Sequence, residues 1–198
     1  MSLLGAKDGS LWIGAGAAAA QLKNNELRYI PRESYGQVNS ILEDQKGDIW
    51  MSLDHLDPGV GPLCRVSGTG MRCFDEADGL KCPFGEALAQ DQSGSIWMGS
   101  YPEVCRWSPQ HSDTYLPAGT HRGGTDVEAI SIALYAGFLL VGFSKSGPHL
   151  GLEQLIDGQW QSLDMPGMKG SDRTVSALLI DKEGGLWLGR RVREYITY

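Results

Sequence analysis

Residues 91–99 read Asp-Gln-Ser-Gly-Ser-Ile-Trp-Met-Gly: an acidic turn that opens at a glycine and leads into an apolar strand centred on tryptophan. The pattern returns at residues 44–52 and 181–189, and in a shorter form at 8–14. A degenerate copy at 137–142 has Leu140 in place of the tryptophan. Self-similarity at a nearly constant spacing is typical of a repeat protein. The sequence therefore indicates a chain built from copies of one unit.

The tryptophan positions of the five copies lie at residues 12, 50, 97, 140 and 187, which gives steps of 38, 47, 43 and 47 residues. Repeats of roughly 40–50 residues built from short strands indicate propeller blades of four strands each. Helical repeats of similar length are excluded by the 27 Gly and 9 Pro among 198 residues. The sequence predicts an all-β fold, a β-propeller of four-stranded antiparallel blades with about five repeat units.

The predicted propeller domain spans residues 1–198, with blades at about 1–34, 35–79, 80–123, 124–169 and 170–198. The first unit lacks a clear innermost strand, and the last lacks an outermost strand after a third strand at 192–198. A partial propeller, a fragment of a larger ring, accounts for this better than a closed ring with irregular ends. Open sheet edges would remain, and we expect further blades of a parent protein or another copy to pair with them.

Three residues of each well-matched copy are predicted to have structural roles. The glycine supplies the positive φ of a tight turn, the aspartate caps the turn, and the tryptophan packs between neighbouring blades. These structural repeat residues are Asp44, Gly47, Trp50, Asp91, Gly94, Trp97, Asp181, Gly184 and Trp187.

The formal net charge of −7 argues against a nucleic-acid partner, which needs a basic face, and against attraction to an anionic membrane surface. No apolar run approaches the length of a membrane span. No signal peptide is recognisable, and the opening Met-Ser-Leu resembles a cloning remnant.

The four cysteines Cys64, Cys73, Cys82 and Cys105 lack the spacing of a metal site. A two-residue turn at Gly68 and Thr69 would place Cys64 opposite Cys73, so a cross-strand disulfide is one interpretation in an oxidising compartment. The other is that both are small buried apolar side chains. The position of Cys105, equivalent to that of Cys64, favours packing there.

The pattern Val-x-x-Ile-Leu-x-Asp-x-x-Gly-x-Ile-Trp-Met, followed by a Leu-x-Arg or Val-x-Arg strand, resembles the two-component regulator propeller repeat. Residues 38–52 with 63–65 and residues 88–99 with 104–106 carry it, and residues 175–189 supply a third match. The chain departs from the pattern at residues 134–142 and 15–20.

The resemblance implies a non-catalytic, ligand-sensing input module of a bacterial signalling protein, periplasmic or otherwise extracytoplasmic. A histidine kinase or other output domain would belong to the parent protein, and the ligand would be a small molecule such as an oligosaccharide. The alternatives are a protein-interaction scaffold and a propeller carbohydrate-active enzyme or lyase. No catalytic residue, cofactor or metal site is predicted, since the histidines have no ligand spacing and no Gly-x-Ser-x-Gly elbow occurs.

Recognition in a propeller is expected in loops held by the rigid blades. The loops between second and third strands and those between blades share one face, and polar or aromatic residues there are candidates for a sugar site. The predicted ligand-binding residues are His55, Asp57, Tyr101, His121, Arg122, His149 and Arg173. Trp107 and Trp160 are alternatives, although their strand positions favour packing.

Overall fold

The computed structural model describes residues 1–30, 36–54, 60–67, 70–109, 111–117, 120, 127–172 and 174–189. These residues form five antiparallel sheets, four of which have four strands. Within each four-stranded sheet the strands lie side by side in chain order, as in a propeller blade. The predicted all-β propeller architecture is confirmed.

The first blade contains the strands β1 (Ser2–Gly5), β2 (Leu11–Ala15), β3 (Ala18–Lys23) and β4 (Glu26–Tyr29). The prediction that it lacks its innermost strand was therefore wrong. β1 pairs with β2 along its whole length, from Ser2 opposite Gly14 to Gly5 opposite Leu11. Ser2 and Leu3 of the opening Met-Ser-Leu lie in this strand.

The next three blades contain four strands each. Blade 2 contains β5 (Gln37–Glu43), β6 (Ile49–Asp54), β7 (Leu63–Ser67) and β8 (Gly70–Phe74). Blade 3 contains β9 (Leu88–Gln90), β10 (Ile96–Gly99), β11 (Val104–Ser108) and β12 (His111–Tyr115). Blade 4 contains β13 (Ala129–Tyr135), β14 (Phe138–Phe143), β15 (Leu152–Ile156) and β16 (Gln159–Ser162).

The fifth unit has β17 (Ala177–Ile180) and β18 (Leu186–Gly189) as its described strands. The third strand predicted at 192–198 lies outside the described residues. Two short 3-10 helices, η1 (Glu76–Asp78) and η2 (Gly170–Asp172), lie in the connections between blades.

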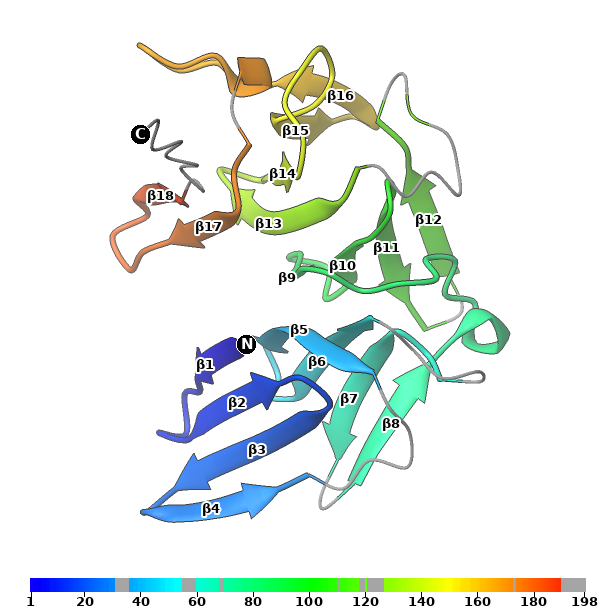
Figure 1. The fold of residues 1–198 in the computed structure, drawn as a ribbon, viewed down its shortest axis with the longest axis vertical. Helices are drawn as coiled ribbons and strands as arrows, with labels where there is room; N and C mark the ends of the chain where they lie inside the picture. Colours follow the sequence, from blue (N-terminus) through cyan, green and yellow to red (C-terminus); the bar gives the residue numbers. More distant parts are fainter. Residues whose placement is uncertain are drawn as a thin grey trace, which may run out of the picture.

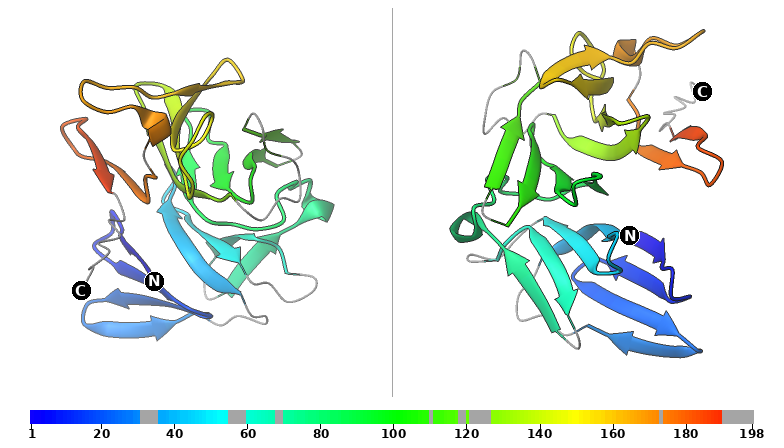
Figure 2. Two further views of the ribbon diagram at one scale, coloured as in Figure 1. Left: turned by 45° about the horizontal axis from the view of Figure 1, so that its top comes forward. Right: turned by 180° about the vertical axis from the view of Figure 1, so that it is seen from behind.

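The blades are arranged radially, with the first strand of each unit nearest a common axis (Figure 1). β1, β5, β9, β13 and β17 follow one another around this centre, and the last strands point outward. The view from behind in Figure 2 shows the same order. The described sheets do not close into a ring, and no strand pairing joins β1 to β17 or β18 in the described part of the chain.

The repeated tryptophan fills the space between one blade and the next. Trp12 packs against Val38 and Ile41 of blade 2, whereas Trp50 and Trp97, each 7% exposed, pack against blades 3 and 4. Trp50 and Trp97 therefore pack between blades in this structure. Trp187 differs, because 63% of it is exposed and no described blade follows it.

The aspartate at the turn does more than the predicted capping. One oxygen of Asp91 accepts the backbone N–H groups of Ser93 (2.9 Å) and Ser95 (3.0 Å), which is the expected cap. The other accepts the indole N–H of Trp97 at 3.1 Å. Asp44 with Trp50 and Asp181 with Trp187 repeat this arrangement at 3.0 and 2.6 Å. Each aspartate therefore ties its hairpin turn to the side chain that packs between blades.

The glycine after the tryptophan allows close approach of the next blade. A Cβ atom on Gly99 would lie 2.1 Å from the carbonyl oxygen of Ala129, and one on Gly142 would lie 2.1 Å from that of Val175. A larger residue at either position on β10 or β14 would push away the backbone at the start of the next blade.

All four cysteines are in disulfides. Cys64 and Cys73 lie opposite each other on β7 and β8 and are bonded, which settles the interpretation that the sequence left open. Cys105 is bonded to Cys82, so its interpretation as a packing residue alone was wrong. The partner lies 23 residues away in the connection between blades 2 and 3, which the equivalence of Cys64 and Cys105 could not reveal.

We expect each disulfide to stabilise the domain by about 2–4 kcal/mol, and Cys82–Cys105 more than Cys64–Cys73 because it closes the longer loop. Urea unfolding of the two double alanine variants, one for each bond, would measure the difference. When the protein with its native sequence is unfolded without a reducing agent, no cysteine thiol should react with an aromatic disulfide reagent. Four reactive thiols under these conditions would contradict the pairing.

Candidate functional site

The described residues include two of the seven predicted ligand-binding residues, Tyr101 and His149. The other five lie outside the described residues: His55, Asp57, His121, Arg122 and Arg173. A sugar site in these loops therefore stays a prediction.

Tyr101 lies beside two carboxylates from neighbouring segments. Its hydroxyl is 3.0 Å from Asp54 Oδ2, at the end of β6, and 2.5 Å from Glu86 Oε1, in the connection before β9. The single hydroxyl hydrogen can be donated to one of them at a time. Burial, and then the neighbouring charges of Glu86 and Asp54, raise the pKa of Tyr101, so it remains a neutral donor.

These contacts join a loop between second and third strands to a connection between blades, which supports the prediction that the two loop classes share a face. His149 is exposed and has a positive φ of 60° in the loop after β14. No hydrogen bond or ion pair in the described part of the chain links it to Tyr101. The structure thus gives Tyr101 a defined polar environment and leaves His149 on the surface.

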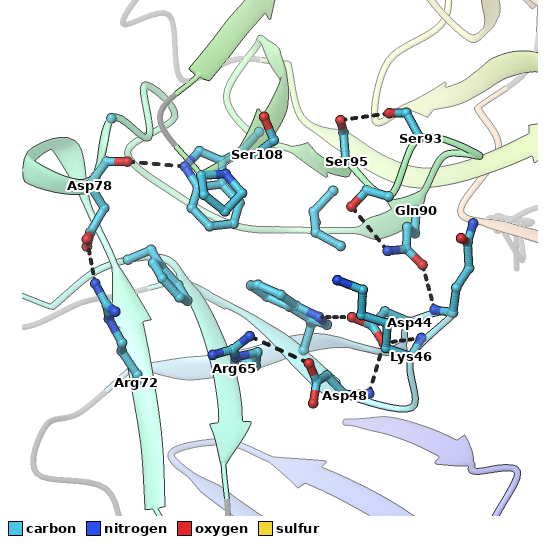
Figure 3. Close-up of a pocket in the computed structure, with 18 of the residues that line it drawn as sticks. Asp44, Lys46, Asp48, Arg65, Arg72, Asp78, Gln90, Ser93, Ser95 and Ser108 are labelled. Atoms are coloured by element: carbon cyan, nitrogen blue, oxygen red, sulfur yellow. Dashed lines mark hydrogen bonds and ion pairs between the residues drawn. The ribbon is translucent and has the colours of Figure 1, made fainter.

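A cavity away from Tyr101 and His149 lies in the wedge between blades 2 and 3 (Figure 3). This interblade cleft has a volume of about 790 Å³. It is lined by the acidic turns after β5 and β9, by β7 and β8, and by residues around η1. Most of these segments are not the loops in which the sequence predicted recognition.

Three aromatic side chains form the apolar wall of the interblade cleft. Trp50 stacks on Phe74 with ring centroids 5.7 Å apart, and Trp107 contacts both at 5.8 and 4.8 Å. Trp107 is only 2% exposed, which confirms that packing dominates at this alternative site residue. Trp160 likewise packs, edge to face, against Phe143.

The rim of the interblade cleft consists of charged side chains in balanced number. Lys46, Arg65 and Arg72 face the cavity together with Asp44, Asp48 and Asp78. Figure 3 shows Arg72 paired with Asp78 on one side and Arg65 directed toward Asp48 on the other, at 2.8 and 3.5 Å. Six charged groups with no net formal charge favour a neutral, hydrogen-bonding ligand over an anion or a cation.

Gln90 of blade 3 lines the interblade cleft and bonds to both the turn of blade 2 and the turn of its own blade. The backbone N–H of Gln45 donates to Gln90 Oε1 at 2.7 Å, and Gln90 Nε2 donates to the carbonyl of Gly94 at 3.1 Å. The amide of Gln90 is therefore fixed in position at the edge of the cavity. Fixed donors and acceptors beside an apolar wall are what a selective small-molecule site requires.

Smaller cavities occupy the wedges on either side. The wedge between blades 1 and 2 holds about 470 Å³, and that between blades 3 and 4 about 230 Å³. In the second of these, Arg106 lies over Trp97 as Arg65 lies over Trp50, both at 5.7 Å from the ring centroid. Burial raises the pKa of Asp91 there, but hydrogen bonds from Ser93 and Arg106 outweigh it and hold that pKa below its usual value.

The arginine and aspartate side chains of the interblade cleft were not among the predicted site residues. Arg65 was quoted only as part of the repeat pattern, but its register opposite Trp50 is what directs it over the wedge. The described residues contain no group of three or more His, Cys, Asp or Glu able to hold a metal ion. Among the same residues, no helix is long and apolar enough to cross a membrane.

Comparison of the sequence with protein-family models and with curated proteins gave no match. Comparison of this structure with solved structures did find similar proteins. The extracellular domain of the putative hybrid two-component system BT4673 from B. thetaiotaomicron superimposes with a TM-score of 0.68 at 17% identity, covering 96% of this chain and 26% of that one.

PorZ, described as a surface component of the type-IX secretion system of Porphyromonas gingivalis, matches with a TM-score of 0.63 at 14% identity, over 96% of this chain and 31% of PorZ. A putative gluconolactonase matches with a TM-score of 0.61 at 14% identity, over 93% of this chain and 69% of that one. At these identities the likeness shows a shared propeller fold. The chain spans about a quarter of the extracellular domain that it matches.

Proposed function

We propose that this chain is a non-catalytic ligand-sensing module that acts outside the cytoplasm as the signal input of a two-component-type protein. The observation that carries the proposal is the match of nearly the whole chain to the extracellular domain of a putative hybrid two-component system. The repeat pattern points to the same class of protein. The output domain and the membrane anchor would belong to other parts of such a protein.

The disulfides give independent support for the location. Four of four cysteines are paired, and disulfides persist in oxidising compartments and are rare in the cytosol of most organisms. Both bonds join segments of the propeller itself, so the fold in this form is the one expected of a periplasmic or extracellular protein.

We place the ligand in the interblade cleft and expect it to be a short neutral oligosaccharide. The paired guanidinium and carboxylate groups on the rim can donate to and accept from the hydroxyls of a sugar. The balanced charge of the rim disfavours strongly acidic sugars. A volume of about 790 Å³ is within the range of small-molecule sites.

Calorimetric titration with neutral and acidic oligosaccharides tests this proposal. Arg65→Gln and Arg72→Gln should each weaken binding of the neutral ligand about tenfold or more, because each removes a charged hydrogen-bond donor from the rim. Arg106→Gln is the matched control, since Arg106 holds the same position over Trp97 in the next blade. Its binding constant should stay within about twofold of the native value.

Three outcomes would count against the proposal. Turnover of the sugar would indicate an enzyme, as the likeness to a putative gluconolactonase allows. Loss of binding in Tyr101→Phe or His149→Ala, with Arg65→Gln unaffected, would move the site to the loop face predicted from the sequence. Binding of a protein partner with no response to any sugar would favour the interaction scaffold.

A further inference from the structure

Two arginines face the interblade cleft from directly opposite positions on adjacent strands. Arg65 on β7 and Arg72 on β8, which we call the cleft arginines, form one cross-strand pair, and both line the cavity (Figure 3). Their guanidinium carbons lie 5.7 Å from the ring centroid of Trp50 and 4.8 Å from that of Phe74, respectively. Both guanidinium groups are always charged, and like charges directly opposite each other weaken the pairing of antiparallel strands. Blade 2 therefore keeps a cross-strand pair that costs stability.

The carboxylate partners of the cleft arginines offset only part of this repulsion. Arg65 lies 3.5 Å from Asp48, and Arg72 lies 2.8 Å from Asp78, on the two far sides of the pair (Figure 3). The four side chains are between 28% and 64% exposed. Ion pairs that are exposed to this degree contribute little to stability, because water screens them.

The other blades place no like charges at this position, which follows the tryptophan across the sheet. In blade 3 the pair is Arg106 opposite Asp113, whose charges attract. In blade 1 it is Gln21 opposite Arg28, and Arg28 donates through Nη2 to Gln21 Oε1 at 3.2 Å. In blade 4 both residues are glutamines. Among the four-stranded sheets that the structure describes, two facing cations occur in blade 2 alone.

A disulfide joins the same two strands one residue away from the cleft arginines. Cys64 directly precedes Arg65 on β7, and Cys73 directly follows Arg72 on β8. Because side chains alternate between the faces of a strand, the cysteines point to the other face, where they pack in the cluster that contains Trp12. β8 is the outermost strand of its sheet and pairs only with β7 among the described strands. The disulfide thus fastens an edge strand where the two charges repel.

No other blade has a disulfide between its third and fourth strands. In blade 3 the equivalent pair is Cys105 opposite Thr114, and Cys105 is bonded instead to Cys82 in the connection between blades. The two disulfides use all four cysteines of the chain. The cross-strand disulfide and the pair of like charges therefore occur together, in the one blade that directs two arginines into the cleft.

We propose that the Cys64–Cys73 disulfide is a positioning element of the interblade cleft, which holds the cleft arginines side by side against their mutual repulsion. Without this bond, β8 separates from β7 more readily at this point, and the two guanidinium groups no longer face the cavity together. The role of the cleft arginines in ligand binding rests on the proposed function. Their separation on loss of the disulfide does not.

Hydrogen exchange of the β8 amides over Gly70–Phe74 tests the electrostatic argument without a ligand. In the variant with Cys64→Ala and Cys73→Ala, these amides should exchange at least tenfold faster than in the native chain. Adding Arg65→Gln recreates the glutamine–arginine pair of blade 1 and should slow this exchange about threefold, since it removes the opposition of like charges. In the native chain, where the disulfide holds the strands together, Arg65→Gln should leave the exchange unchanged.

The variant with Cys82→Ala and Cys105→Ala is the matched control. It also lacks one disulfide, but its β7–β8 disulfide is intact, so adding Arg65→Gln should not slow the exchange of β8. Mild reduction of the folded native chain provides a second route that needs no cysteine substitution. Cys73 is partly exposed, whereas Cys82 and Cys105 are 2% and 0% exposed, so the Cys64–Cys73 bond should be reduced first and β8 should then exchange faster.

Calorimetric titration with maltotriose, cellotriose and mannotriose as neutral probes tests the consequence for binding. A trisaccharide that binds the native chain should bind the variant with Cys64→Ala and Cys73→Ala at least tenfold more weakly. Undiminished binding in that variant would overturn the proposal, and so would a failure of Arg65→Gln to slow its β8 exchange. A native chain that binds no sugar would contradict the proposed function instead, and the exchange experiment would still decide whether the disulfide opposes the repulsion.

Discussion

Replacing Trp97 with alanine should lower the free energy of unfolding by about 3–5 kcal/mol, the cost of removing a large buried aromatic side chain. Trp97 packs against Ala129, Leu139 and Val141 of blade 4, and its ring lies 5.2 Å from that of Tyr115. The change also removes the indole N–H that Asp91 accepts. Because the side chain joins two blades, the loss should appear in a single unfolding transition of the domain followed by urea denaturation.

The matched control for Trp97→Ala is Trp187→Ala. Both residues occupy the same place in the repeat and donate to an aspartate, but Trp187 is 63% exposed. We expect the control to cost about 1 kcal/mol or less. Equal effects of the two substitutions would show that burial between blades is not what the tryptophan contributes.

Glu153 should make the domain less stable as the pH rises. It lies on β15, is fully buried, and both carboxylate oxygens lack a hydrogen-bond partner in the described part of the chain. Burial, with a smaller contribution from the nearby charge of Asp164, raises the pKa of Glu153 to about 7. The folded state thus prefers the protonated carboxyl, and the unfolded chain, with an ordinary pKa near 4.5, does not.

The sign of the effect follows from this difference. Below about pH 4.5 Glu153 is protonated in both the folded and the unfolded state, and its contribution to the free energy of unfolding is fully present. Between pH 4.5 and 7 only the unfolded state releases the proton, so this contribution is progressively lost. Glu153→Gln, which is neutral at every pH, should therefore be more stable than the native chain by about 2–3 kcal/mol at pH 8 and nearly equal to it at pH 4.5.

Urea unfolding of both proteins across this range measures the difference directly and cancels the contributions of all other titrating groups. The pKa values of Asp91 and Asp181 are lowered in the folded state. These two residues therefore make the domain less stable as the pH falls, and they do so in a more acidic range than Glu153. A difference between Glu153→Gln and the native chain that does not change with pH would contradict the assignment.

The repeat made most of the fold predictable, because spacing, turn glycines and strand alternation all indicate the same four-stranded unit. β1 was missed because its sequence, Ser-Leu-Leu-Gly, is short and is followed by Ala6, whereas aspartates, Asp44 and Asp91, directly follow β5 and β9. The partner of Cys105 was missed because it lies in a connection rather than on a strand, where register gives no information. The constant separation of six residues between aspartate and tryptophan could have revealed the bond to the indole.

The candidate site was less predictable than the fold. The interblade cleft depends on how far two sheets diverge and on which side chains fill the gap, and neither is encoded in one repeat alone. The charges on its rim come from β7, β8 and the turns, segments that the sequence had assigned to structure only. The loop residues chosen for recognition were identified by residue type, which does not show whether they converge.

The hydrogen bond between aspartate and tryptophan connects the hairpin turn to the packing of the blades. The same carboxylate caps the turn and orients the indole ring that packs between neighbouring blades. A domain built this way behaves as a linear series of coupled units, in which each unit is held by its own hairpin and by its neighbour. The aspartate–tryptophan bond is absent from the junction after blade 4, where Leu140 replaces the tryptophan and the turn at Ala136 and Gly137 has no carboxylate. Partial opening of the native state should therefore begin at the fifth unit, and the amide protons of β17 and β18 should exchange with solvent before those of the first three blades.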